Sequence, residues 1–240
     1  VKLGALKKEF VVEADANTFD IDIYANSAFH IERINQADWI SLTCGETEDG
    51  KGAITAECEF NEGFKRKAGF VLCSDVDARR DTVYVKQKAL VDAKIEFANS
   101  SVIVAGAGGE NVSPIETNIP FSEITVDIEY AKADNADWIE SLEIVDSESE
   151  KRSLSITTEA NAADEIPRSA AVSLSFTDGW DETVSVEFNL LQRTAKETLG
   201  RQITFEEFRR TYAMNKKVED YVILEGIVVS NTKTVSYTHL

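Results

Sequence analysis

Apolar and polar residues alternate with a period of two through most of the first 190 residues. Phe19, Ile21 and Ile23 alternate with polar neighbours, and the same pattern recurs in three further segments, 54–60, 172–177 and 184–190. A strand with one face on a core and the other in water has this pattern. Gly-, Asn- and Asp-rich turns separate the runs, and no helical period interrupts them. The pattern predicts antiparallel β-sandwiches built from short strands.

Four short motifs occur twice, in the same order and at nearly the same spacing. The matched segments are 37–40 with 136–139, 54–57 with 156–159, 66–68 with 168–170 and 81–85 with 182–186. The spacing drifts by only a few residues, as loops of slightly different length would allow. Residues 1–90 and 91–195 are therefore predicted to be two copies of one domain, and residues 196–240 to be a third part.

The order of residues within each copy resembles the BACON domain, the Bacteroidetes-associated carbohydrate-binding, often N-terminal module. The segments that carry the resemblance are 26–39, 61–72 and 81–87 in the first copy and 118–138, 161–174 and 182–192 in the second. The family usually ends in Val-x-Gln, and Val85-Lys86-Gln87 fits this ending in the first copy. The second copy departs from it, because residues 186–191 run on before Gln192. The resemblance implies an all-β chain with two tandem immunoglobulin-like sandwiches, and it implies a carbohydrate ligand.

Residues 196–240 differ in character from the two copies. Thr204 and Glu207 have the spacing of a capping box, and Phe205, Phe208 and Tyr212 share one face of the predicted helix. An apolar strand is predicted at 221–229. Helix and strand together resemble the start of an OB-like domain of unknown function found after BACON-type modules in lipoproteins. We expect this part to be a truncated, short helix–strand fragment of such a domain.

Charge narrows the classes of partner. The chain has 25 Lys and Arg against 43 Asp and Glu, which gives a net charge of −18. Nucleic-acid binding and adhesion to anionic lipid both need excess positive charge, so neither is expected. Because 43% of the residues are apolar, the acidic chain can still bury cores. No apolar run reaches the ~18–20 residues of a membrane span.

The cysteines and histidines predict neither a metal site nor a cofactor. Cys44, Cys58 and Cys73 lack a CxxC spacing, and only His30 and His239 accompany them. Two interpretations of the thiols stay open at this point: buried or half-buried free thiols, or a Cys44–Cys58 disulfide. His30 is predicted to be a surface or sheet-edge residue of a strand at 29–34.

The motifs of common enzyme classes are missing or incomplete, so we predict no catalytic residues and no enzyme. The glycine-rich segment 106–109 lacks the third glycine and the helix that a dinucleotide needs, which indicates a loop between strands. There is no Gly-x-Ser-x-Gly elbow. The acidic segment 75–81 is either a calcium loop without its glycine or, as we favour, a solvated hairpin.

The three tryptophans separate into two groups. Trp39 and Trp138 hold the same place in both copies and are predicted to be core residues. Trp180 lies in a predicted turn between Asp178 and Asp181. It either stacks on the apolar face of a sugar, with the carboxylates accepting hydroxyl groups, or folds back onto its own hairpin. Phe64 is a weaker candidate of the same kind in the first copy.

These observations lead to one expected function and one alternative. We expect a non-catalytic cell-surface module that binds a carbohydrate or mucin glycan, and a neutral polysaccharide is favoured because the net charge repels anionic ones. The alternative is a structural spacer or protein-binding module that positions a downstream domain away from the outer membrane. In both cases we expect an exported outer-membrane lipoprotein, held to the membrane by a lipid anchor before residue 1.

Overall fold

The computed structural model describes residues 2–131, 137–146, 152–162, 166–194, 201–202, 204–211 and 222–224. Contacts between residues divide the chain into two compact units. The first unit is Val1–Phe97, Ile115–Val126 and Ser173–Val186, and the second is Ala98–Pro114, Asp127–Val172 and Glu187–Leu240. The hairpin 173–186 thus belongs to the first unit. The boundaries at 90 and 195 stay a prediction.

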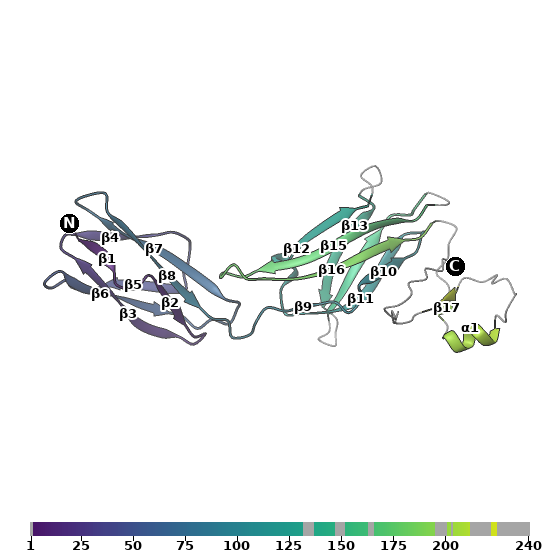
Figure 1. Ribbon diagram of the computed structural model, residues 1–240, viewed down its shortest axis with the longest axis horizontal. Helices are drawn as coiled ribbons and strands as arrows, with labels where there is room; N and C mark the ends of the chain where they lie inside the picture. The colour runs from purple at the N-terminus through teal and green to yellow at the C-terminus, as the bar shows by residue number, and fades with distance from the viewer. Residues whose placement is uncertain are drawn as a thin grey trace, which may run out of the picture. The chain divides into compact units, whose positions relative to one another are not determined.

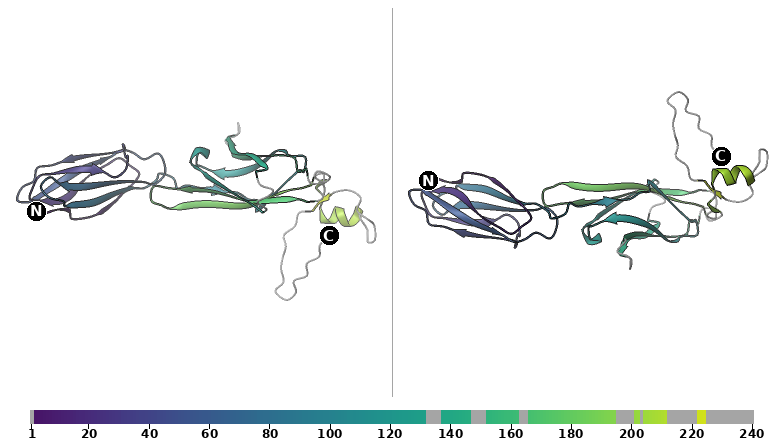
Figure 2. Two further views of the ribbon diagram at one scale, coloured as in Figure 1. Left: turned by 90° about the horizontal axis from the view of Figure 1, so that it is seen from above. Right: turned by 90° about the horizontal axis from the view of Figure 1, so that it is seen from below.

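Eight strands make up the first copy of the repeat, in two sheets of four (Figures 1 and 2). One sheet has the order β1-β3-β6-β5 and the other the order β2-β8-β7-β4. The strands are β1 Leu3–Ala5, β2 Glu9–Val12, β3 Asn17–Ala25, β4 Phe29–Arg33, β5 Ile40–Cys44, β6 Lys51–Cys58, β7 Arg66–Ser74 and β8 Arg80–Gln87. Their inward side chains meet in one core, which includes Ile21 and Ile54 from one sheet and Phe70, Leu72 and Val83 from the other.

The second copy repeats this arrangement. Its strands are β9 Ile95–Glu96, β10 Ser101–Val104, β11 Gly109–Thr117, β12 Thr125–Tyr130, β13 Ile139–Asp146, β14 Arg152–Thr158, β15 Arg168–Thr177 and β16 Thr183–Gln192, with a 3₁₀ turn at Phe121–Glu123. The sheet orders are β13-β14-β11-β9 and β10-β16-β15-β12. In the first copy β1-β3-β6-β5 corresponds to strands A, B, E and D of an immunoglobulin sandwich, and β4, β7 and β8 to strands C, F and G. In the second copy β9-β11-β14-β13 and β12, β15 and β16 take the same places. The predicted fold class, tandem immunoglobulin-like β-sandwiches, is confirmed.

Each copy adds one parallel pair to its otherwise antiparallel sheets. β2 runs parallel to β8, with Glu9 opposite Tyr84, and β10 runs parallel to β16, with Ser101 opposite Asn189. In each copy the chain starts at the edge of one sheet and then crosses to the edge of the other. Dividing the first strand in this way covers an edge of both sheets. Strands as short as β1 and β9 are too brief for an alternation pattern to reveal the crossing.

Two local predictions are confirmed. Segment 106–109 is a turn between β10 and β11, where Gly108 has φ +76° and a Cβ there would lie 2.5 Å from the Thr158 carbonyl oxygen. A short helix, α1, spans Phe205–Thr211, and the Glu207 amide donates to Thr204 Oγ1 at 3.1 Å, as an N-cap requires.

The rest of the C-terminal part is described only in pieces. The strand pair β17 Arg201–Gln202 and β18 Val222–Ile223 is parallel. Tyr212, most of the strand predicted at 221–229, and His239 lie outside the described residues.

Candidate functional site

An arginine covers a tryptophan in both copies of the repeat. The Arg66 guanidinium lies 4.5 Å from the centre of the Trp39 ring, and the Arg168 guanidinium lies 5.0 Å from that of Trp138. Each arginine begins a strand, β7 or β15, and also donates to main-chain oxygens just after the preceding strand, β6 or β14, which belongs to the other sheet. Burial lowers the pKa of both guanidinium groups, because it withdraws the charged form from water.

A buried glutamine holds each arginine in place. Gln87 Oε1 accepts from Arg66 Nε at 2.9 Å, and its amide nitrogen lies 2.9–3.2 Å from the carbonyl oxygens of Ala14, Asp15 and Glu59. The side chain is fully buried. It adds a second donor to main-chain oxygens that already accept from Asn61, Asn17 and Arg66, and so it ties two loops together.

Gln192 does the same in the second copy. Its Oε1 accepts from Arg168 Nε at 2.7 Å, and its amide nitrogen approaches Ala105 O, Thr158 Oγ1 and Glu159 O at 3.1, 3.3 and 2.6 Å. Arg66 and Gln87 are 21 residues apart, whereas Arg168 and Gln192 are 24 apart. The departure at the end of the second copy is therefore three extra residues in the β15–β16 hairpin, and the role of the glutamine is unchanged.

A buried asparagine completes the repeated frame. Asn61 Nδ2 donates to Phe64 O and Lys88 O, both at 2.8 Å, and Asn161 Nδ2 binds two main-chain oxygens in the same way, at 2.9 and 3.1 Å. The sequence comparison found these polar residues as motif positions but assigned them no role. One signal in the sequence could have indicated this role. The same polar residue type stands at the same place in both copies, next to apolar strands.

The paired tryptophans differ in burial. Trp138 is completely buried, as predicted, and Tyr130 packs on it edge-on with ring centres 5.9 Å apart. Trp39 is half-buried and packs against the core of the first copy, so it is a core residue at the margin of that core. In the first copy β4 ends in Arg33, whose guanidinium binds the main-chain oxygens of Ala37 and Ile40.

Trp180 is neither an open platform nor folded onto its own hairpin. It is half-buried in the first compact unit, and its indole N–H donates to the Arg66 carbonyl oxygen at 3.2 Å. Beside it, the Gly179 amide donates to Lys65 O at 2.8 Å. The ammonium groups of Lys65 and Lys86 lie 5.5 and 5.7 Å from the centre of the indole ring. The tip of the β15–β16 hairpin is thus fixed to the start of β7.

The two predicted carboxylates have partners within this cluster. Asp178 Oδ1 accepts from the amides of Trp180 and Glu182 at 2.8 and 3.1 Å, which closes the turn. Asp181 has φ +65° and pairs with Lys67 at 3.0 Å. The structure therefore brings Trp180, Asp178 and Asp181 to β7, and their binding of a ligand stays a prediction.

Phe64, the fourth predicted residue, lies in the same unit. Its ring packs on Phe176 with centres 4.8 Å apart. Both rings line an open groove of about 790 Å³ together with Trp39. The charged residues of the groove are three cations and three carboxylates, Lys65, Arg66, Lys67, Glu62, Glu123 and Asp178. In a chain with a net charge of −18, the groove is locally neutral.

The cysteines are free, and the disulfide interpretation is wrong. In the β5–β6 pair, Cys44 lies opposite Ile54 and Cys58 opposite Ile40. Four residues along a strand separate the two positions by about 13 Å, whereas a disulfide needs Cα atoms within about 7 Å. Cys58 and Cys73 are buried, and Cys44 is exposed.

Thiol labelling of the folded chain is expected to begin at Cys44. Burial raises the pKa of the Cys58 thiol to about 11, so the reactive thiolate is scarce at neutral pH and increases only as the pH approaches that value. Burial also raises the pKa of Cys44, but that side chain is accessible to reagent. The order in which the cysteines react is measured by labelling kinetics with a chromogenic disulfide and by mass mapping of the labelled sites. Cys44→Ser should remove the fast phase of labelling. Equal rates at Cys44 and Cys58 would contradict the described burial.

Comparison with known proteins identifies no family. No protein-family model and no curated protein matches the chain. Among solved structures, a Bacteroides ovatus GH5 xyloglucanase is 20% identical over 37% of this chain and 19% of its own, with a TM-score of 0.31. An endo-fucoidan hydrolase of glycoside hydrolase family 107 is 12% identical over 80% of this chain and 29% of its own, with a TM-score of 0.26. A chimeric titin Z1Z2 tandem is 13% identical over 80% of this chain and 100% of its own, with a TM-score of 0.34.

These values establish neither a family nor a ligand for the chain. The class rests on the strand order, which defines a tandem of immunoglobulin-like sandwiches. Within the described residues, no helix has the length and apolar character needed to cross a membrane.

Proposed function

We propose that the chain is a non-catalytic module that binds a neutral glycan along the groove beside β7. The observation that carries the proposal is the groove itself, an open site of about 790 Å³ with aromatic and polar walls in the first compact unit. Ligand sites commonly have this size and this mixture of apolar walls with a few polar groups. The proposal places the module outside the cell, where polysaccharide or mucin is met.

The walls of the groove suit a sugar chemically. A pyranose has an apolar face that packs on aromatic rings, and Trp39 and Phe64 are both half-buried and line the groove. The exposed amide of Gln36 and the side chain of Asn118 line it as well and can exchange hydrogen bonds with hydroxyl groups. Because cations and carboxylates balance there, a neutral ligand fits better than an anionic one.

Binding at one groove is expected to be weak. Each sugar hydroxyl exchanges water for a protein partner at small net gain. Attachment to a polymer would then depend on several modules acting together. In this arrangement Trp180 supports the wall of the groove, since its indole N–H already binds β7.

Titration with neutral and sulfated polysaccharides tests the proposal. Wild type should bind a neutral polymer, and Phe64→Ala should weaken that binding about fivefold or more, as loss of an aromatic contact does. Trp180→Ala should weaken it similarly through the groove wall. Tyr24→Ala is the matched control, because Tyr24 is an exposed aromatic of β3 outside the groove, and it should leave affinity within about twofold. Circular dichroism and melting curves establish that each variant is folded.

A second candidate function, a structural spacer, is favoured by one specific observation. Every residue predicted to bind ligand already has a partner in the chain: Trp180 with Arg66, Asp178 with main-chain amides, Asp181 with Lys67 and Phe64 with Phe176. A spacer needs such internal contacts and no ligand. If wild type binds nothing on a broad panel of polysaccharides, the glycan proposal fails and the spacer function replaces it.

A further inference from the structure

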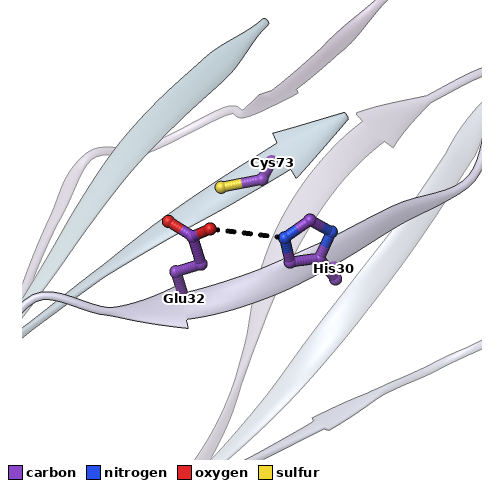
Figure 3. A group of neighbouring side chains, drawn as sticks. All are labelled: His30, Glu32 and Cys73. Carbon is purple, nitrogen blue, oxygen red and sulfur yellow. Dashed lines mark hydrogen bonds and ion pairs between the residues drawn. The ribbon is translucent and has the colours of Figure 1, made fainter. Parts of the chain in front are cut away.

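Four side chains with metal-ligating atoms meet on the outer face of the β4–β7 pair, at the edge of the second sheet. His30 on β4 lies directly opposite Cys73 on β7. Glu32 is two residues from His30 on β4, so these two side chains and Cys73 project on the same side of the ladder, and Asp75 follows directly after β7. As predicted, His30 is an exposed residue of an edge strand. Figure 3 shows His30, Glu32 and Cys73 converging from the two strands.

The distances within this group are short. His30 Nδ1 lies 2.5 Å from Asp75 Oδ1, and His30 Nε2 lies 3.5 Å from Glu32 Oε1. The ligand atoms of His30, Glu32 and Cys73 all lie within 4.8 Å of one another. Cys73 is on the outward face of β7 but only 4% exposed, because its neighbours cover it. Its sulfur is therefore shielded on a surface where a side chain is usually solvated.

His30 and Glu32 each have a second partner that occupies one ligand atom and leaves the other within the cluster. With Nδ1–H donating to Asp75, the neutral imidazole keeps its lone pair on Nε2, and this carboxylate–histidine pairing commonly orients a metal ligand. Arg80 binds Glu32 Oε2 and leaves Oε1 on the histidine side. Two ligands at about 2.1 Å in tetrahedral geometry lie about 3.4 Å apart, close to the observed Nε2–Oε1 separation.

We propose that His30 Nε2, Glu32 Oε1 and Cys73 Sγ form a site for a divalent late transition metal, with Zn²⁺ as the best fit. Nitrogen, sulfur and carboxylate oxygen are the ligands that zinc prefers, and three protein ligands leave the fourth position to water. The thiol releases its proton to the buffer as the sulfur–metal bond forms. The thiolate and the Glu32 carboxylate then balance the charge of the ion, while Arg80 pairs with Glu32 and Asp75 with His30. Asp75 is a positioning residue.

Cobalt titration tests the site, since Co²⁺ reports a thiolate ligand by near-ultraviolet charge-transfer absorption. The full chain is reduced, freed of metal with a chelator and titrated with Co²⁺, and Zn²⁺ then competes. We expect one Co²⁺ per chain with the thiolate band, and displacement of it by Zn²⁺. Cys73→Ser should abolish the band, and the matched control Cys44→Ser should keep both the band and the affinity. Asp75→Asn should weaken Co²⁺ binding about 10- to 100-fold, as loss of a partner to a ligating histidine does.

His30→Gln gives a second test that leaves the core untouched, because His30 is exposed. It should remove the charge-transfer band while Cys73 is still present and the melting curve is unchanged. The proposal is overturned if wild type shows no thiolate band, or if Cys73→Ser or His30→Gln binds Co²⁺ as tightly as wild type. Polysaccharide binding by the groove does not depend on this site and should be the same in all these variants.

Discussion

Replacing Trp138 with alanine is expected to lower the free energy of unfolding of the second sandwich by about 3–5 kcal/mol. The side chain is completely buried, packs on Tyr130 and lies under the Arg168 guanidinium. Its removal loses the transfer free energy of a large aromatic side chain and leaves a cavity in a close-packed core. The desolvated guanidinium would also lose the ring beneath it.

The matched variant Trp39→Ala is expected to cost less, about 2 kcal/mol, because only part of that ring is removed from water. In both variants an arginine lies over the place of the deleted ring, Arg66 in the first copy and Arg168 in the second. The difference between the two losses therefore reports how deeply each tryptophan is buried. Equilibrium unfolding in urea, followed for each sandwich separately, measures the two losses. A loss below about 1 kcal/mol for Trp138→Ala with the fold intact would show that the ring is not a core residue.

The period-two pattern and the internal repeat were enough to predict the fold class. In β3 the inward Ile21 and Ile23 alternate with exposed Asp20 and Asp22, as the pattern indicated. This succeeds because the side chains of a half-buried strand must alternate whatever its partner is. The parallel pairing of β2 with β8 was not predictable, since that pairing depends on a crossing between sheets.

The candidate site shows where prediction from sequence stops. Trp180 was placed correctly in a turn, but the carbonyl that its indole binds, at Arg66, is 114 residues away in the sequence. No local pattern encodes a contact of that separation. The His30–Cys73 pair was missed for a similar reason, because only the register of β4 on β7 brings the two opposite each other. A search for CxxC spacing does not detect ligands contributed by two strands.

The repeated arginine–glutamine frame explains why polar residues recur inside the apolar pattern. In each copy a single amide binds several acceptors and orients the arginine that covers the tryptophan. A buried polar group is tolerated when its hydrogen bonds are made, and it fixes the geometry of the loops around it. We infer that this frame, rather than the hydrophobic core alone, sets the position of the loop that contains Asn61 and lines the groove.

Replacing this glutamine with leucine, a residue of similar size, is therefore expected to be strongly destabilising. Gln87→Leu and Gln192→Leu should each cost about 3 kcal/mol, because each removes the hydrogen bonds of a buried amide nitrogen and takes away the Nε acceptor of a desolvated guanidinium. Gln36→Leu is the control, since its amide is exposed, and it should change stability by less than about 0.5 kcal/mol. Urea unfolding measures all three. If Gln87→Leu is as stable as wild type, the hydrogen bonds of the amide are dispensable and the frame does not hold the loops. The other outcome is that Gln87→Leu is destabilised and also loses the glycan binding that Phe64→Ala weakens. In that case the frame shapes the groove.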